Sequence, residues 1–198
     1  MEDLPGLAIR QREVDVRPGR SPEPVRQRLR DLSDRFYGAH AIHLREQQVP
    51  WAYRVFFRNI GLDPDQTRTP VEQLALDRLQ HGSFRSRGLP DDALVIATVE
   101  TGVALMALDA ECLSGGLAVR TSQPGESLGK GRARLEAGTL VLADAGGPVA
   151  VLFGEAAEVA AVTKGTRRLA LVAILVEGVP EPTVEEALEI AGGALGAA

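Results

Sequence analysis

The sequence LALVAILV at residues 169–176 is the strongest indication of how this chain folds. Every residue in it is apolar, and no polar residue interrupts it at alternate positions. A strand with one face in water alternates apolar and polar side chains, so an unbroken apolar run is typical of a strand covered on both faces. We therefore predict that residues 168–177 form a central strand of the core.

Further strands are expected elsewhere in the second half of the chain. Apolar segments at residues 139–143 and 148–153 flank the turn sequence DAGG at residues 144–147, which predicts a β-hairpin. Residues 93–100 are mostly apolar and fit either a helix or a buried strand. The other predicted strands are residues 103–109, the segment that follows Gly115-Gly116 and contains Leu117 and Val119, and residues 158–162.

The first half of the chain is predicted to be mainly helical. Apolar side chains recur every three or four residues over residues 23–37, and a second helix is expected over residues 50–60. Thr69 and Pro70 are typical of a helix N-cap and first position, with Glu72 near the third position, and a helix to about residue 80 should follow. The remaining predictions are an opening strand with Leu7, Ile9, Val14 and Val16, a closing helix over residues 184–192 capped by Thr183, and a frayed tail at residues 192–198.

These elements predict the α+β class, in which N-terminal helices precede a mostly antiparallel, strand-rich core and a C-terminal helix. The chain has 198 residues, of which 44% are hydrophobic and 25% charged. This composition fits one globular domain and excludes a wholly disordered chain. No apolar run reaches the roughly eighteen residues of a membrane span, so we expect no membrane partner.

The N-terminus and the cysteine content predict a cytoplasmic location. The chain is charged from Glu2 onward and lacks the apolar segment of a secretory leader. Cys112 is the only cysteine, so no intramolecular disulfide can form, which fits a reducing compartment.

The net charge does not by itself predict a protein that coats nucleic acid. It is −5 at pH 7, and the positive excess is confined to about the first 90 residues. Lys130, Arg132 and Arg134 alternate with small residues in a glycine-rich loop and could reach an RNA backbone. A solvated loop is the alternative interpretation.

Aromatic residues are concentrated in the predicted helix over residues 50–60. Exposed aromatic side chains could stack on bases. The spacing of these residues instead favours packing in the core. They are Trp51, Tyr53, Phe56 and Phe57.

The sequence contains no P-loop, no dinucleotide-binding GxGxxG after a strand, no CxxC pair and no GxSxG elbow, so no cofactor is predicted. His40, His43 and Glu46 lie three residues apart, and on one helix they would share a face that could bind a metal. No second cluster supplies further ligands. Surface histidines are therefore the preferred interpretation, and a metal enzyme is a minor alternative.

Two arginine–glutamate pairs are candidates for a ligand site. Arg68 precedes a helix that has Glu72 in its first turn, and Arg120 in a strand is followed by Glu126 after a turn. Each pair could offer a donor and an acceptor to a ligand, or could be a capping carboxylate and a surface salt bridge. Thr101, beside a glycine, could also approach a ligand closely. We expect the segments near residues 70 and 120 to lie close together in space and to line one cavity.

An ordered set of short motifs resembles a known family. Residues 51–64 fit W-x-x-R-x-x-F-x-x-x-G-L-D-P, TRTPVEQL follows at residues 67–74, and GLP follows at residues 88–90. The further matching positions are Arg78, Thr101-Gly102, Asp109, Gly116, Arg120, Gly125-Glu126, Gly129, Val162-Thr163 and Thr166. In this order they resemble the free-standing relatives of the B3/4 domain of the phenylalanyl-tRNA synthetase beta chain.

This resemblance implies a B3/4-like core over residues 50–178, with residues 1–49 integral to the domain and residues 179–198 forming a C-terminal helix and tail. In the synthetase the B3/4 domain hydrolyses tyrosine wrongly attached to the phenylalanine tRNA. The resemblance therefore implies a tRNA or aminoacyl-tRNA partner and a trans-acting deacylase of mischarged aminoacyl-tRNA. The residues it places toward the ligand are Arg68, Glu72 and Asp109 for substrate binding, and Thr101, Arg120 and Glu126 for catalysis.

In this interpretation Glu126 orients water, Arg120 neutralises charge and Thr101 bonds the substrate. The chain departs from the family pattern in a shortened loop after Pro90, in the replacement of a late N-R motif near Gly154-Glu155, and at two single residues. Val95 stands where asparagine is expected, and Ala104 where a proline is usual. The loss of polar groups favours a more apolar ligand and leaves open a non-catalytic module that binds an amino acid, an aminoacyl group or a protein partner.

Overall fold

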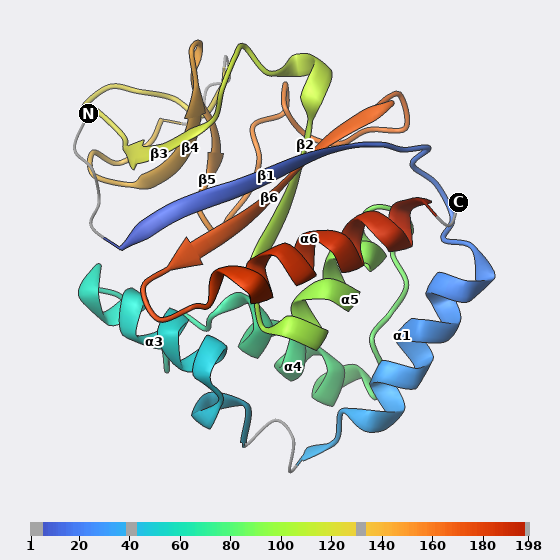
Figure 1. The fold of residues 1–198 in the computed structure, drawn as a ribbon. Helices are drawn as coiled ribbons and strands as arrows, with labels where there is room; N and C mark the ends of the chain where they lie inside the picture. Colours follow the sequence, from blue (N-terminus) through green and yellow to red (C-terminus); the bar gives the residue numbers. More distant parts are fainter. Residues whose placement is uncertain (1–5, 39–42, 130–133, 197–198) are drawn as a thin grey trace.

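The computed structural model of the protein describes residues 6–38, 43–129 and 134–196. These residues form an α+β fold with two three-stranded antiparallel sheets, and the helices gather below the first sheet (Figure 1). The strands are β1 (Leu7–Asp15), β2 (Leu105–Asp109), β3 (Ala118–Thr121), β4 (Leu140–Asp144), β5 (Gly147–Val151) and β6 (Arg168–Val176). The helices are α1 (Glu23–Arg35), α3 (Gln48–Asn59), α4 (Pro70–His81), α5 (Asp91–Thr101) and α6 (Glu181–Gly196), with short 3-10 turns η1 (Leu44–Glu46) and η2 (Ala110–Cys112).

Strand β6 occupies the centre of the first sheet, between β1 and β2. The β1 register runs from Leu7 opposite Val176 to Asp15 opposite Arg168. Residues 169–174 are all buried. The predicted central strand is therefore confirmed, and its bounds agree with the prediction to within one residue.

A buried tyrosine joins the helical half to the first sheet. Tyr53, on α3, is fully buried, and its hydroxyl donates to the carbonyl oxygen of Ile174 in β6. The same hydroxyl oxygen accepts the N–H of Ala104, just before β2, at 3.1 Å. Burial raises the pKa of Tyr53, so the phenol keeps its proton and remains a donor.

The second sheet has the order β3-β4-β5, and its β4–β5 hairpin confirms the prediction made from residues 144–147. Asp144 stabilises the turn: its Oδ1 accepts the N–H of Gly146 at 2.7 Å, and its Oδ2 accepts the N–H of Ser114 at 2.7 Å. Gly147 has a φ of 125°, which favours glycine because a side chain would be strained there.

The predicted helices are confirmed at α1, α3 and α4. In α4, Thr69 is the N-cap, Pro70 is the first helical residue and Glu72 is the third, as the sequence predicts. Residues 93–100, which fit either a helix or a strand, are helical within α5. Gly102, with a φ of 78°, ends α5 in the left-handed conformation common after a helix.

The prediction of a strand at residues 158–162 is wrong. The N–H of Ala160 donates to the carbonyl of Ala157 at 2.9 Å, which closes a turn, and residues 158–162 pair with no strand. The carbonyl of Ala160 instead accepts the N–H of Asp109 at 2.9 Å. The apolar run at residues 159–162 is typical of a strand, but only Ala160 of this segment is buried and the segment forms a turn.

The predicted limits of the closing helix are also wrong at both ends. Thr183 is not its cap, because α6 begins at Glu181. Residues 192–196 are helical rather than frayed, since Ala194 and Leu195 are buried against the core.

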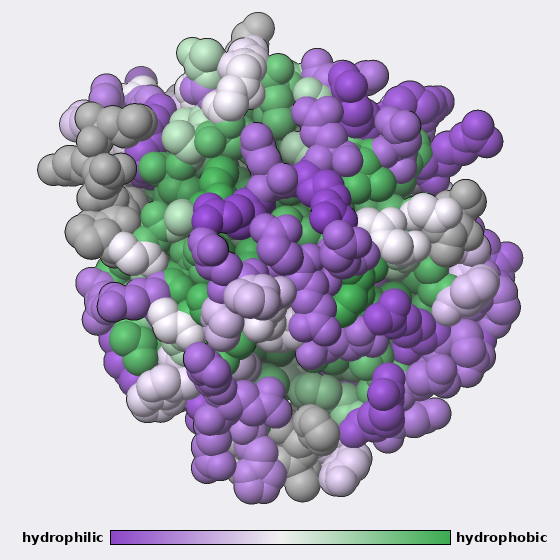
Figure 2. Space-filling model, in the orientation of Figure 1, coloured by the Kyte–Doolittle hydropathy of each residue, from purple (hydrophilic) through white to green (hydrophobic). Residues whose placement is uncertain are grey.

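Hydrophilic side chains cover much of the face that carries β1 and α6, with smaller apolar areas between them (Figure 2). Two ion pairs join these elements, Arg10 with Glu181 and Arg12 with Glu189, the second with an Nη2–Oε1 distance of 2.6 Å. In the part of the chain that the structure describes, no helix has the length and hydrophobicity needed to cross a bilayer.

The position of Tyr53 makes a testable prediction. Tyr53→Phe keeps the ring but leaves the buried N–H of Ala104 without its acceptor and removes the donor to Ile174. We expect a loss of about 1–3 kcal/mol in the free energy of unfolding, the usual cost of a buried unsatisfied group. Urea unfolding with an unchanged m-value would measure it, and a loss below about 0.5 kcal/mol would contradict the anchoring role.

Candidate functional site

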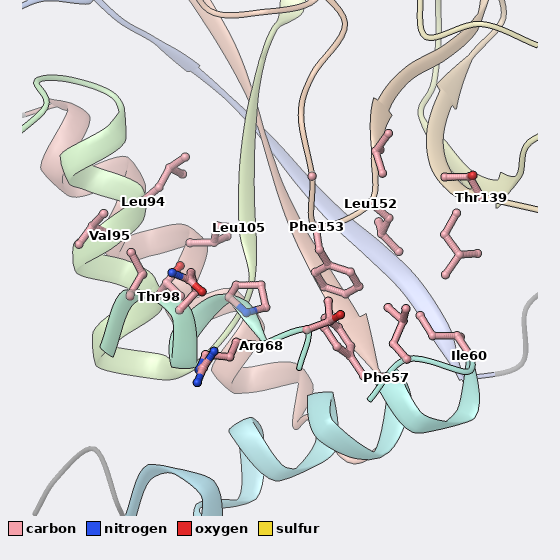
Figure 3. A pocket seen from close by; sticks show the side chains of 18 of the residues that line it. Phe57, Ile60, Arg68, Leu94, Val95, Thr98, Leu105, Thr139, Leu152 and Phe153 are labelled. Carbon is pink, nitrogen blue, oxygen red and sulfur yellow. The ribbon is translucent and has the colours of Figure 1, made fainter. Parts of the chain in front are cut away.

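A cavity of about 850 Å³ lies between the helices and the second sheet. Residues of α3, α4, α5 and β2 form one side of it, and residues of β3, β4 and the turn after β5 form the other. Figure 3 shows side chains from these elements around one hollow. A cavity of this volume is typical of a small-molecule site.

The walls of the cavity are mainly apolar. Leu94 and Val95 of α5 line one wall, and Leu152 and Phe153 line another (Figure 3). Phe153 has a φ of 61°, a conformation that costs a bulky residue on the order of 1–3 kcal/mol. Its ring packs against Phe57 with the centroids 5.1 Å apart, which helps to hold it there. Backbone strain of this kind is concentrated at functional sites.

Charged groups stand at a few places around these apolar walls. Arg68 comes from the segment before α4, and Arg87 and Asp91 lie at the start of α5. Among the described residues, none of the three forms an ion pair within 4.0 Å. Partial burial raises the pKa of Asp91, against the opposing charge of Arg87 and with the added repulsion of Asp92. The neutral polar residues of the lining are Thr67, Gln73, Thr98, Thr121 and Thr139.

The structure separates the first candidate pair, Arg68 and Glu72. Glu72 lies in a buried ion pair in which Arg54 Nη1 donates to its Oε1 at 2.7 Å, and both side chains are 5% exposed. Its Oε2 accepts the Oγ1 proton of Thr69 at 2.9 Å and also the backbone N–H of Thr69 at 3.3 Å, and this second bond completes the capping box of α4. Arg54 also donates to Asp65 at 2.7 Å. Arg68 thus lines the cavity, while Glu72 stabilises the start of α4.

The second candidate pair forms a salt bridge beside the cavity. Arg120 Nη2 donates to Glu126 Oε1 at 2.7 Å, and Nη1 donates to Oε2 at 2.8 Å. Thr121, the next residue of β3, lines the cavity. Neighbouring residues of a strand point to opposite faces, so Arg120 points away from the cavity. The structure therefore matches the interpretation of this pair as a salt bridge.

The same contacts set the basicity of Glu126. The hydrogen bonds from Arg120, together with the N–H of Gln123 at 2.7 Å, lower the pKa of Glu126 to about 2. A carboxylate with this pKa is a weak base at neutral pH and is poorly suited to take a proton from water.

Thr101 is held by its own helix end. Its Oγ1 donates to the carbonyl of Ala97 at 2.7 Å and accepts the N–H of Val103 at 3.1 Å. The threonine that lines the cavity is Thr98, three residues earlier on α5 (Figure 3).

Asp109 is likewise engaged in the fold. Its Oδ2 accepts the hydroxyl of Thr166 at 2.6 Å, and its Oδ1 accepts the N–H of Glu111 at 3.1 Å. The residue is 8% exposed. These bonds fix the segment before β6 to the end of β2.

The histidine cluster shows no metal-binding geometry in the described chain. His43 and Glu46 are exposed and approach each other to 3.3 Å, whereas His40 lies outside the described residues. No group of three or more His, Cys, Asp or Glu side chains within residues 6–38, 43–129 and 134–196 is placed to hold a metal ion. Lys130 and Arg132 also lie outside these ranges.

The aromatic helix divides between core and surface. Tyr53 and Phe57 are buried, as the core interpretation predicts. Trp51 is 50% exposed, and Arg58 lies 5.4 Å from its ring centroid. The core interpretation is therefore wrong for Trp51.

Sequence reasoning did not identify most of the cavity wall. A signal was present in residues 93–99, which are apolar except for Thr98, because a helix that is apolar on nearly every side must be covered all round or line a cavity. No comparable signal marks Phe153, since its strained backbone depends on a turn and on contacts with α3.

No protein-family model matches the chain, and no curated protein matches it. The resemblance to the B3/4 domain therefore rests on the motifs of the sequence alone. The α+β architecture and the cavity are observed independently of it.

The lowered pKa of Glu126 predicts a pH dependence of stability. Its pKa is about 2 in the folded protein and near 4.5 when unperturbed, so its contribution to stability is full above about pH 5 and is lost as the pH falls toward 2. The midpoint of thermal unfolding should therefore be higher for the wild type than for Glu126→Gln at pH 6–7. The two midpoints should converge near pH 2. A difference that did not change between pH 7 and pH 2.5 would contradict this assignment.

Proposed function

We propose that this protein is an editing-like module that binds the aminoacyl group of an aminoacyl-tRNA in the cavity. The observation that carries the proposal is the combination of apolar walls with Arg68, Arg87 and Asp91, which form no ion pair in the described chain. An aminoacyl group has the complementary parts: an ammonium for Asp91, a carbonyl oxygen for an arginine and a side chain for the apolar walls. The motifs shared with the B3/4 domain support the same ligand class.

The cavity favours an apolar aminoacyl side chain. Val95 lines the wall at the position where the resemblance to the B3/4 domain implies asparagine, and Leu94, Leu105 and Leu140 add further apolar surface. A phenolic hydroxyl placed against these side chains would lose its hydrogen bonds to water without replacement. We therefore propose a preference for leucine, methionine or phenylalanine over tyrosine.

Hydrolysis of the aminoacyl ester is a second candidate function, and Asp91 is the observation that favours it. Asp91 is a carboxylate of the cavity lining with a raised pKa, so it is a better proton acceptor than Glu126. In this reaction water attacks the ester carbonyl while Asp91 takes its proton. The ester bond then breaks, the ribose oxygen regains a proton, and free amino acid and tRNA are released.

Blocking the cavity tests the proposed binding function. Val95→Arg places a long side chain in the cavity and should weaken binding of an aminoacyl-tRNA carrying leucine or phenylalanine by at least about tenfold. The matched control is Val55→Arg, on α3, because Val55 is 37% exposed and does not line this cavity. Binding would be measured with non-hydrolysable aminoacyl-RNA analogues, with the thermal midpoint of each variant recorded. Equal effects of the two variants, or no binding by the wild type, would contradict the proposal.

Substitution of Asp91 tests the hydrolytic candidate. If Asp91 accepts the proton, Asp91→Asn should lower kcat for release of amino acid from a mischarged tRNA by about 100-fold or more. Glu126→Gln should change kcat by less than about twofold, because Glu126 is held by Arg120 away from the cavity. Tight binding without release by the wild type would reject hydrolysis and leave a binding module.

A further inference from the structure

A second hollow adjoins the cavity at the start of α5. It is enclosed by residues 18–20, by residues 86–91 and by residues 162–164, three segments far apart in the sequence. Arg87 and Asp91 line both this hollow and the main cavity. A ligand with two parts could therefore occupy both spaces at once.

The second hollow differs from the main cavity in its charge. Four cationic side chains line it, Arg20, Arg26, Arg87 and Lys164, against the single carboxylate of Asp91. Among the described residues, Arg20, Arg87 and Lys164 form no ion pair within 4.0 Å. Arg26 pairs with Glu23 through Nη2, but its Nε is buried and has no hydrogen-bond partner there. This excess of donors predicts an anionic ligand.

The loops around the hollow are fixed by buried hydrogen bonds. Asp92, 1% exposed, accepts the hydroxyl of Ser21 at 2.6 Å and the N–H of Arg87 at 2.8 Å, and it also accepts the hydroxyl of Ser86. A Cβ on Gly88 would lie 2.5 Å from the carbonyl oxygen of Gly19, so the two loops approach as closely as they do only with glycine. The cationic side chains therefore extend from a preformed frame, which lowers the cost of ordering a ligand.

We infer that the second hollow binds a nucleotide phosphate attached to the aminoacyl group that occupies the main cavity. The inference rests on the proposed function. An aminoacyl nucleotide carries an apolar side chain and an anionic phosphate a short distance apart, and Arg87 and Asp91 line both the main cavity and the second hollow. Arginine forks and a lysine ammonium are the usual protein partners of phosphate.

The test uses a fluorescent RNA hairpin that ends in single-stranded CCA and carries no amino acid. Arg20→Ala combined with Lys164→Ala should weaken its binding at least about tenfold and lower the slope of log K against log salt by about 1. The matched control is Arg35→Ala combined with Arg58→Ala, which removes the same charge outside the hollow and should change the affinity less than about twofold. Equal weakening by the two double variants would overturn the inference, because general charge attraction would then explain the binding.

Competition with adenosine monophosphate and with inorganic phosphate identifies the source of the anion. Displacement of the hairpin by adenosine monophosphate, lost in the Arg20/Lys164 double variant, supports a nucleotide phosphate. Displacement by inorganic phosphate alone at equal concentration would overturn the nucleotide part of the inference. If adenosine monophosphate and inorganic phosphate displace the hairpin from the Arg20/Lys164 double variant as well as from the wild type, the site itself would be overturned.

The failure of this inference can be told apart from the failure of the proposed function. Val95→Arg blocks the main cavity and should leave binding of the uncharged hairpin within about twofold of the wild type, because this RNA carries no aminoacyl group. If Val95→Arg abolishes aminoacyl binding and the Arg20/Lys164 variant does not affect RNA, the phosphate site is wrong and the cavity stands. If RNA binding depends on Arg20 and Lys164 but no aminoacyl group binds, the proposed function is wrong and the anion site stands.

Discussion

Strand β6 is stable only where protein covers both of its faces, and this requirement arranges the rest of the molecule. Its edges are paired with β1 and β2, which come from positions far apart in the chain. Helix α6 packs against β1 and β6, and Tyr53 bonds directly to the backbone of β6. The burial of apolar side chains is the largest favourable contribution to folding, so these contacts fix the helices to the first sheet.

The cavity follows from this arrangement. Helix α5 packs against α6 and is followed directly by β2, so its position is set by the first sheet. The second sheet has its own hairpin, whose turn is closed by local hydrogen bonds, and its buried residues Leu142 and Ala150 belong to the same hydrophobic core as β6. The cavity lies beside this shared core, between α5 and the residues that follow β5.

Local patterns in the sequence were sufficient for the elements that local physics controls. The apolar run of β6, the hairpin at residues 144–147 and the capping box of α4 were all predicted, because burial, turn angles and capping depend on neighbouring residues. The cavity depends on how α5 and residues near 153 are placed opposite each other, which no short segment reveals. Residues 158–162 show the opposite limit, since four consecutive apolar residues there form a turn rather than a strand.

The same distinction explains why the two glutamates that stood out in the sequence, Glu72 and Glu126, stabilise the fold. Glu72 and Glu126 lie within a few residues of the groups they cap or bond, so folding can satisfy them at short range and with little loss of chain entropy. Each gains an arginine as well, and a carboxylate paired in this way has little remaining capacity to bind a ligand.

Arg68, Arg87 and Asp91 have no such partner in the described chain and face a cavity whose walls are apolar. Charges left unpaired beside an apolar cavity interact most strongly with a ligand that brings the opposite charge and displaces water, because the lower local dielectric strengthens the attraction. The unpaired charges of this fold, and not its strongest ion pairs, are therefore the groups that a bound molecule would complete.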